Sequence, residues 1–371
     1  MKNQKFLIGL IACAVAGPAM AVTPVTGDLF FVGFAEPPEN GLGGADFAWD
    51  GTALTFSNII PTTAAGNLAP LVDLADTDAV IFARNLNPAV NPNGNLLVSG
   101  RSNGFIFQID PNTLATTQAP SGHAFHLSVD AANQAIYTSA EQPGQLKRVL
   151  FSSFGTNIQP TNITVVGANA ASPNLVTELL FAPNGTIFYT NTGEAGAASS
   201  AANNSFGIAT FSNSTTLVTT ELFAGQKQHG MVYDPFSNTI IVAGGDLIYQ
   251  YDLSGNLLAS VQVTAALFGQ SANFPHQIDK PEVDAAGHLF VTDNGGNGTI
   301  HFIDYSTSPT KLINDFVNNG YDSTQFSTNL EHVAVVWTGF PPVPEPTTAL
   351  FGIGLGFASL AGRFRRMRPA A

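Results

Sequence analysis

The fold is decided by residues 229–261, which read HGMVYDPFSNTIIVAGGDLIYQYDLSGNLLASV. Four short apolar runs follow one another here. The gaps between them hold turn-forming residues such as Pro235, Asn238 and Gly255. Short runs rich in Val, Ile and Tyr with such punctuation are typical of β-strands joined by tight turns. This stretch therefore predicts a unit of four short strands.

The same unit recurs along the chain. Its second strand, a run rich in Leu, Ile and Val that follows a turn, begins near residues 96, 135, 186, 239 and 288. A spacing of about 40 to 55 residues matches one four-stranded blade of a β-propeller. The repeat therefore predicts an all-β propeller. A β-sandwich with many strands is the main competitor, and the repeat disfavours it.

The two ends of the repeat region predict how the ring closes. Residues 331–337 resemble a first strand with no second strand after it, and residues 28–34 resemble a second strand with no first strand before it. Pairing these two runs would complete one blade and leave no open sheet edge. We therefore predict six blades, one of them shared between the termini. Seven blades would require a further blade within residues 46–86.

The repeat resembles those of NHL and streptogramin-lyase-like propellers, in which a turn precedes an apolar strand with an aromatic residue. Residues 229–252 match this pattern best, and the copies at 126–138 and 282–293 are looser. The resemblance implies the fold and no particular activity, because many functions share this architecture. Lactonases of the SMP-30-like family use a Glu before the first strands as a metal ligand, and residues 26–29 contain none.

The N-terminus predicts export. A cationic start with Lys2 and Lys5 precedes an apolar run over residues 6–15, and Ala19-Met20-Ala21 supplies a small-x-small cleavage site. This order is typical of a secretory signal peptide over residues 1–21. An uncleaved membrane anchor is the alternative. An apolar run of about ten residues is short for that role.

The C-terminus has three parts in sequence: Pro344-Glu345-Pro346, an apolar stretch over residues 347–361, and a basic end with Arg363, Arg365 and Arg366. This order resembles the PEP-CTERM sorting signal. The resemblance implies processing by an exosortase near Pro344-Glu345-Pro346, in a Gram-negative bacterium that secretes exopolysaccharide. A proline linker before a plain tail anchor is the alternative. We predict three parts of the chain: 1–21, a propeller over 22–340, and a sorting segment over 341–371 with an apolar helix.

These end segments predict a route through the cell. The secretion translocon would export the chain, and residues 347–361 would hold it transiently in the inner membrane. The arginines would stay on the cytoplasmic side. Exosortase processing would then lead to the cell surface or the extracellular matrix, where exopolysaccharide or another surface protein would be the partner.

Composition excludes several function classes. Seven of the 13 basic residues lie between the end segments, while all 26 acidic residues lie in the body or the Pro-Glu-Pro motif, so the exported part carries about −19. Such a charge opposes nucleic acid, which requires clustered Lys and Arg. The sole cysteine, Cys13, leaves with the signal peptide. The mature protein therefore has no disulfide and no thiolate ligand.

One end of the predicted channel carries the candidate site. The loops at that end are expected to be long, over residues 35–45, 61–87, 167–176, 192–205 and 265–279. Polar residues gather where the first strand of each blade begins: Asn87, His126, Glu178, His229, His276, Asp279, Glu331 and His332. Imidazoles among them favour zinc or iron, and carboxylates alone favour calcium. His126 and His229 are also candidates for acid/base catalysis. Plain hydrogen bonding within the channel is the alternative.

Motifs for nucleotide binding and for a His-Glu-x-x-His zinc site do not occur. The sequence therefore favours a binding module over an enzyme. A metal-assisted hydrolase or lyase, resembling lactonases or streptogramin lyases, is the alternative. A purely structural matrix protein is a third.

Overall fold

The computed structural model describes most of the chain between Val25 and Trp337. The described ranges are residues 25–33, 41–62, 70–74, 76–83, 86, 94–100, 103–139, 146–167, 176–191, 205–224, 228–264, 278–293, 298–316, 318–321 and 330–337. The predicted signal peptide and sorting segment lie outside these ranges. Within them, no helix is long and apolar enough to cross a membrane.

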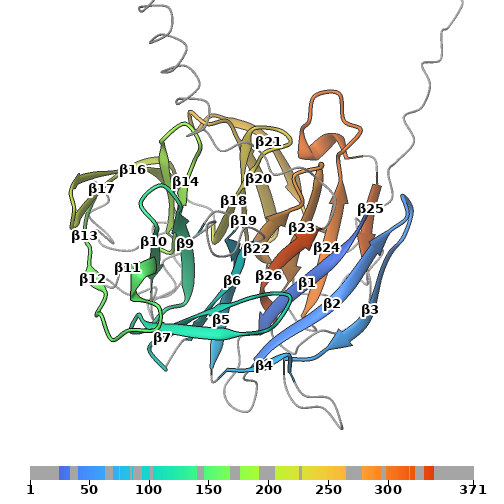
Figure 1. Ribbon diagram of the computed structural model, residues 1–371. Coiled ribbons are helices and arrows are strands. Elements are labelled where there is room, and N and C mark those ends of the chain that lie inside the picture. The colour runs from blue at the N-terminus through green and yellow to red at the C-terminus, as the bar shows by residue number, and fades with distance from the viewer. Residues whose placement is uncertain are drawn as a thin grey trace, which may run out of the picture.

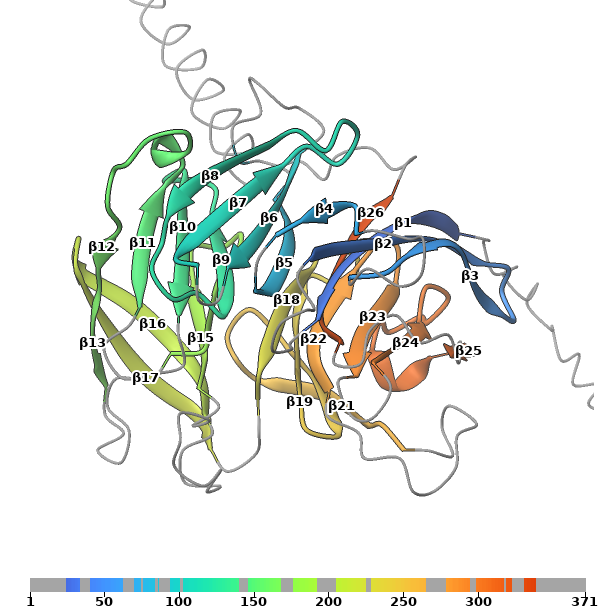
Figure 2. The same cartoon turned by 90° about the horizontal axis from the view of Figure 1, so that it is seen from below.

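Six sheets surround a central axis, as Figures 1 and 2 show, and the four strands of each blade pair antiparallel. The innermost strands are β26 (Leu330–Trp337), β5 (Thr77–Ala83), β9 (His126–Asp130), β14 (Glu178–Phe181), β18 (Gly230–Asp234) and β22 (Ile278–Val283). The second strands are β1 (Val25–Gly33), β6 (Asn95–Gly100), β10 (Ala135–Ser139), β15 (Ile187–Asn191), β19 (Thr239–Gly244) and β23 (His288–Asp293). Each sheet is one blade, numbered 1 to 6 in this order.

The outer half of each blade completes the propeller. The third strands are β2 (Gly41–Trp49), β7 (Phe105–Ile109), β11 (Lys147–Leu150), β16 (Ser205–Asn213), β20 (Leu247–Tyr251) and β24 (Thr299–Asp304). The outer strands are β3 (Leu54–Ile60), β8 (Thr116–Pro120), β12 (Thr161–Asn162), β17 (Thr216–Ala224), β21 (Leu257–Gln262) and β25 (Asn318–Tyr321). Two 3₁₀ turns, Phe151–Ser153 and Ile313–Asp315, lie in the connections.

The ring closes as the sequence predicts. β26 pairs antiparallel with β1, so that Trp337 lies opposite Gly27 and His332 lies opposite Val32. The inner strands of successive blades contact one another around the ring, and β22 contacts β26 across the seam. The six-bladed propeller with a blade shared between the two termini is confirmed.

Two additional strands modify the ideal blade. β4 (Val72–Asp73) pairs with β2 beside blade 1. β13 (Thr164–Gly167) follows the two-residue outer strand of blade 3 but pairs in parallel with β17 of blade 4. The chain thus leaves blade 3 early and adds a fifth strand to blade 4.

The residues that pack between blades form six hydrophobic clusters, one at each of the six blade-to-blade interfaces of the described structure. Between blades 4 and 5, for example, the rings of Phe206 and Tyr251 stack with centroids 4.3 Å apart. Full burial of one large apolar side chain stabilises a fold by roughly 1.5–3 kcal/mol. Each blade therefore depends on both neighbours for its core.

Aspartates end the strands at regular places. Asp234, at the end of an inner strand, accepts hydrogen bonds from the backbone N–H groups of Phe236 (3.0 Å) and Ser237 (3.1 Å). At the end of a third strand, Asp252 accepts from the N–H groups of Ser254 (2.8 Å) and Asn256 (2.9 Å). Such bonds favour a turn over continued strand, which explains the punctuation seen in the sequence.

The prediction for residues 61–87 was wrong. This segment is not one loop, because it contains β4 and the inner strand of blade 2, β5, whose Val80 lies opposite Val98. Asn87 therefore does not precede the inner strand but follows it, and its own position lies outside the described residues. No seventh blade lies within 46–86, since the described part of that segment supplies strands of blades 1 and 2. The predicted loop 35–45 also ends earlier, at the start of β2.

Candidate functional site

Three histidines meet where the inner strands begin. The ring of His126, from blade 3, lies between those of His229 and His332, with centroids 4.6 Å and 5.3 Å away. The three are 2%, 5% and 1% exposed. They come from blades 3, 5 and 1, so only closure of the ring brings them together. We call this group, with Glu178, Asp279 and Lys280, the channel cluster.

The backbone that carries these residues is anchored from the neighbouring blade. The Oγ atoms of Ser99, Ser139 and Thr190 donate to the carbonyls of Phe125 (3.5 Å), Thr177 (2.5 Å) and His229 (2.7 Å), respectively. Each hydroxyl lies at the end of a second strand, and each carbonyl lies just before or within the start of the next inner strand. The positions of His126, Glu178 and His229 are thus fixed by a contact that repeats around the ring.

His229 and Asp279 form a pair in which Nδ1 of the imidazole lies against Oδ1 of the carboxylate. Both side chains are buried. A carboxylate at Nδ1 holds the proton there and leaves Nε2 as the basic nitrogen, which is the arrangement that general bases use. This pair is the part of the channel cluster best suited to proton transfer.

His332 differs from the other two histidines. Neither of its ring nitrogens has a hydrogen-bond partner among the described residues, although the side chain is fully buried. Burial lowers the pKa of His332 well below its ordinary value, and electrostatic interaction with His126, Lys280 and His229 lowers it further. The carboxylate of Asp279 opposes the shift without reversing it. His332 is therefore neutral at neutral pH.

Glu178 and Lys280 form a buried ion pair across the channel. The Lys280 ammonium also donates to the carbonyl of Met231 (2.8 Å), and Oε2 of Glu178 accepts from the Met231 N–H (2.9 Å). Three inner strands, β14, β18 and β22, are linked in this way. Both charges are consequently compensated inside the protein.

Lys280 was not among the predicted site residues. In a regular strand two successive side chains point to opposite faces, so a neighbour of Asp279 would be expected to point away from it. The pairing register of β22 with β23 shifts between Ile278 and Pro281. Such an irregularity allows both Asp279 and Lys280 to reach the channel cluster. A Lys next to an Asp at a strand start, followed by a proline, was the only sequence signal.

The structure brings together five of the predicted site residues: His126, Glu178, His229, Asp279 and His332. His276 lies outside the described ranges, and Glu331 is placed as part of β26 without its side chain being described. Within the described residues, no three His, Cys, Asp or Glu side chains are arranged so that they could hold a metal ion.

Two further buried histidines are paired away from this group. His288 Nδ1 lies 2.6 Å from Oδ2 of Asp284, and His301 Nε2 lies 2.8 Å from Oδ2 of Asp293. Both pairs lie within blade 6, where they link strands or a strand and its turn. These pairs give both histidines a structural role.

Known proteins match this chain at its end and in its fold. Residues 342–366 match the PEP-CTERM protein-sorting motif. This motif indicates export and exosortase-mediated sorting to the cell surface, so the predicted sorting signal is confirmed. No curated protein matches the sequence significantly.

Solved propellers superpose on most of the chain. A structure of the nidogen/laminin complex matches with a TM-score of 0.51 and 10% identity, over 85% of this chain and 100% of that one. A putative 6-phosphogluconolactonase from Bacteroides fragilis matches with a TM-score of 0.50 and 8% identity, over 83% of this chain and 84% of that one. Such low identity shows the fold alone. The chain is thus a six-bladed β-propeller that carries a PEP-CTERM sorting motif.

Proposed function

We propose that this protein is a binding module displayed by exosortase sorting at the cell surface or in the extracellular matrix, with the propeller over residues 22–340 as its mature body. The signal peptide over residues 1–21 directs export, and the segment over 341–371 holds the inner-membrane intermediate. Exopolysaccharide or a surface protein is the partner. The observation that carries this proposal is that the charged side chains of the channel cluster are paired with one another inside the protein.

The carboxylates of the channel cluster are already engaged by other groups of the protein. Glu178 is engaged by Lys280 and by the Met231 N–H, and Asp279 lies against His229. Carboxylates that already have such partners are poorly available to a metal or a substrate. This supports a rigid scaffold for recognition over a metal-dependent enzyme.

Binding is tested with purified residues 22–340 and extracellular matrix isolated from a producing strain from which the gene has been deleted. We expect saturable co-sedimentation of the propeller with the matrix or with washed cells. The matched control is the same protein after thermal unfolding. Native protein that stays in the supernatant at all concentrations would contradict a binding role.

Sorting is tested separately in the native host. Replacing Pro344-Glu345-Pro346 by three alanines should leave unprocessed protein in the inner membrane, because the motif that the exosortase reads is gone. Immunoblots of membrane and surface fractions measure this. Unchanged processing and surface delivery would count against exosortase sorting.

A hydrolase or lyase that works in the channel is the second candidate, and the His229–Asp279 pair favours it. Together with His126 it offers a basic nitrogen beside a second imidazole, which is sufficient for general acid and base roles. The test combines metal analysis, melting with and without EDTA, and turnover of lactones, esters and uronic-acid polymers. Activity or a stoichiometric metal that is lost in His126→Gln/His229→Gln, with the fold retained, would support this candidate. Metal-free, inactive protein would exclude it.

A further inference from the structure

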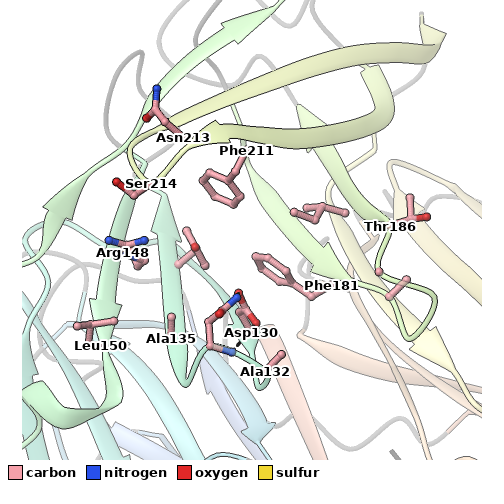
Figure 3. A pocket seen from close by; sticks show the side chains of 15 residues that line it. Asp130, Ala132, Ala135, Arg148, Leu150, Phe181, Thr186, Phe211, Asn213 and Ser214 are labelled. Carbon is pink, nitrogen blue, oxygen red and sulfur yellow. Dashed lines mark hydrogen bonds between the residues drawn. The ribbon is translucent and has the colours of Figure 1, made fainter. Parts of the chain in front are cut away.

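A groove opens between blades 3 and 4 (Figure 3), and none of its lining residues belongs to the channel cluster. Its volume is about 600 Å³, within the range of roughly 300–1,000 Å³ that is usual for small-molecule sites. One wall comes from blade 3 and carries Tyr137, Arg148 and Leu150, and the other comes from blade 4 and carries Phe181 and Phe211.

The groove exists because the two blades have unequal outer halves. The outer strand of blade 3 has only two residues, and the chain then crosses to β17 of blade 4. In blade 4, by contrast, β16 and β17 have nine residues each. The hydrophobic cluster between the blades buries Tyr137 and Leu179, while Phe181 and Phe211, which pack against it, stay only partly buried.

Aromatic rings form the floor of the groove. The ring of Tyr137 lies between those of Phe181 and Phe211, with centroids 5.2 Å and 5.5 Å away and ring planes inclined by 30° and 36°. The two phenylalanines are only partly buried, so ring surface faces the groove. The face of an aromatic ring carries negative charge density, which attracts the slightly positive C–H groups of a ligand that lies flat on it.

Polar groups surround this floor. The Arg148 guanidinium lies near the Tyr137 hydroxyl, and its buried Nε has no hydrogen-bond partner among the described residues. Asp130 accepts from the N–H (3.0 Å) and the side-chain amide (2.7 Å) of Asn133. The exposed turn between β16 and β17 adds Asn213. The rim thus offers charged, amide and hydroxyl groups that can exchange hydrogen bonds with hydroxyls.

We propose that this groove binds a neutral oligosaccharide. This inference rests on the binding role proposed above, and it adds the binding site and the class of ligand. A sugar ring presents C–H groups on its faces and hydroxyls around its edge, which matches an aromatic floor with a polar rim. The charge of the groove and of the whole exported protein favours neutral sugars over acidic ones. The lining holds one cation, Arg148, and one anion, Asp130, and the exported part carries about −19, which repels polyanions.

The experiment measures binding of residues 22–340 to an array of neutral and acidic glycans, followed by calorimetry with cellotetraose, maltotetraose, mannotetraose and tetragalacturonate. Phe211→Ala removes part of the floor. Ala132→Trp inserts bulk from an exposed turn that lines the groove. We expect each variant to raise the Kd for the neutral glycan about tenfold or more. Melting temperatures verify that the variants are folded, and Ala132→Trp leaves the core untouched.

Matched controls carry the same changes elsewhere. Phe56→Ala removes a partly buried ring at the interface of blades 1 and 6, and Asn112→Trp adds bulk to an exposed turn of blade 2. Both should bind like the parent protein. Absence of neutral-glycan binding, binding of tetragalacturonate alone, or unchanged binding by the two groove variants would overturn the groove assignment. Matrix co-sedimentation that persists in those variants would leave the binding role itself intact.

Discussion

At the scale of single residues, His332 links the channel to pH, because its buried ring has no hydrogen-bond partner in the part of the chain that the structure describes. His332 is neutral because burial and nearby positive charge disfavour its protonated form. The unfolded chain exposes the same imidazole to water, where it titrates near its ordinary value of about 6.5. Folding and proton binding at this residue therefore oppose each other.

The pH dependence of stability follows from that opposition. Because the pKa of His332 is lower in the folded state, stability is complete above about pH 6.5 and is lost as the pH falls toward the lower pKa. Urea unfolding at pH 8 and pH 5 measures the loss. We expect His332→Gln to reduce the difference between the two pH values. Equal pH dependence in parent and variant would show that His332 is not responsible.

The buried ion pair gives a second prediction. Lys280→Met leaves the Glu178 carboxylate buried without its cation, and losing one partner of such a pair typically costs about 3–5 kcal/mol of unfolding free energy. Lys280→Met/Glu178→Gln should recover part of that loss, because no uncompensated charge remains. Denaturant titration of the three proteins measures this. A double variant less stable than Lys280→Met would contradict it.

At the scale of strands and turns, the repeated Ser and Thr hydroxyls join each blade to the next. Thr190→Val keeps the shape of the side chain but removes the bond to the carbonyl of His229, which lies buried. The expected loss is about 1–2 kcal/mol in unfolding free energy. Thr220→Val, on the exposed side of β17, is the control and should change stability little. Equal effects of the two substitutions would argue against this role of the bond.

The strands also show what the sequence can and cannot predict. The period of the second strands and the two unpaired end runs were enough to predict six blades and the closing pair β1–β26. They were also enough to predict that His126, His229 and His332 begin inner strands. The inner strand β5 was missed because eleven residues separate Ala83 from the start of β6, whereas four residues join the first two strands in the copies that begin at His126 and Gly230.

Other features depend on strand register and on contacts between blades, which no local sequence pattern encodes. Lys280 reaches the channel because the pairing of β22 is irregular. The groove between blades 3 and 4 exists because β13 leaves its own blade for β17. Neither event can be deduced from apolar spacing, since both are decided by packing after the strands have formed.

At the scale of the whole molecule, the seam in blade 1 determines whether the ring is stable. A chain that stops at residue 329 lacks β26, so β1 loses its inner partner and the cores on both sides of blade 1 lose Val333, Ala334 and Val335. We expect this truncation to abolish cooperative unfolding, measured by calorimetry. Residues 22–340 are the control and should melt in one transition. A truncated chain with the same melting temperature would contradict closure as the source of stability.

The same seam sets the orientation of a tethered molecule. Because β1 and β26 are antiparallel with Gly27 opposite Trp337, both chain ends emerge at the end of the axis remote from His332. The β9–β10 and β16–β17 turns that border the groove lie at that same end. While attached through its C-terminus, the protein would point the end of the axis nearest His332 toward the surroundings. Its groove would face back toward the envelope, where a glycan strand would be held between the propeller and the cell.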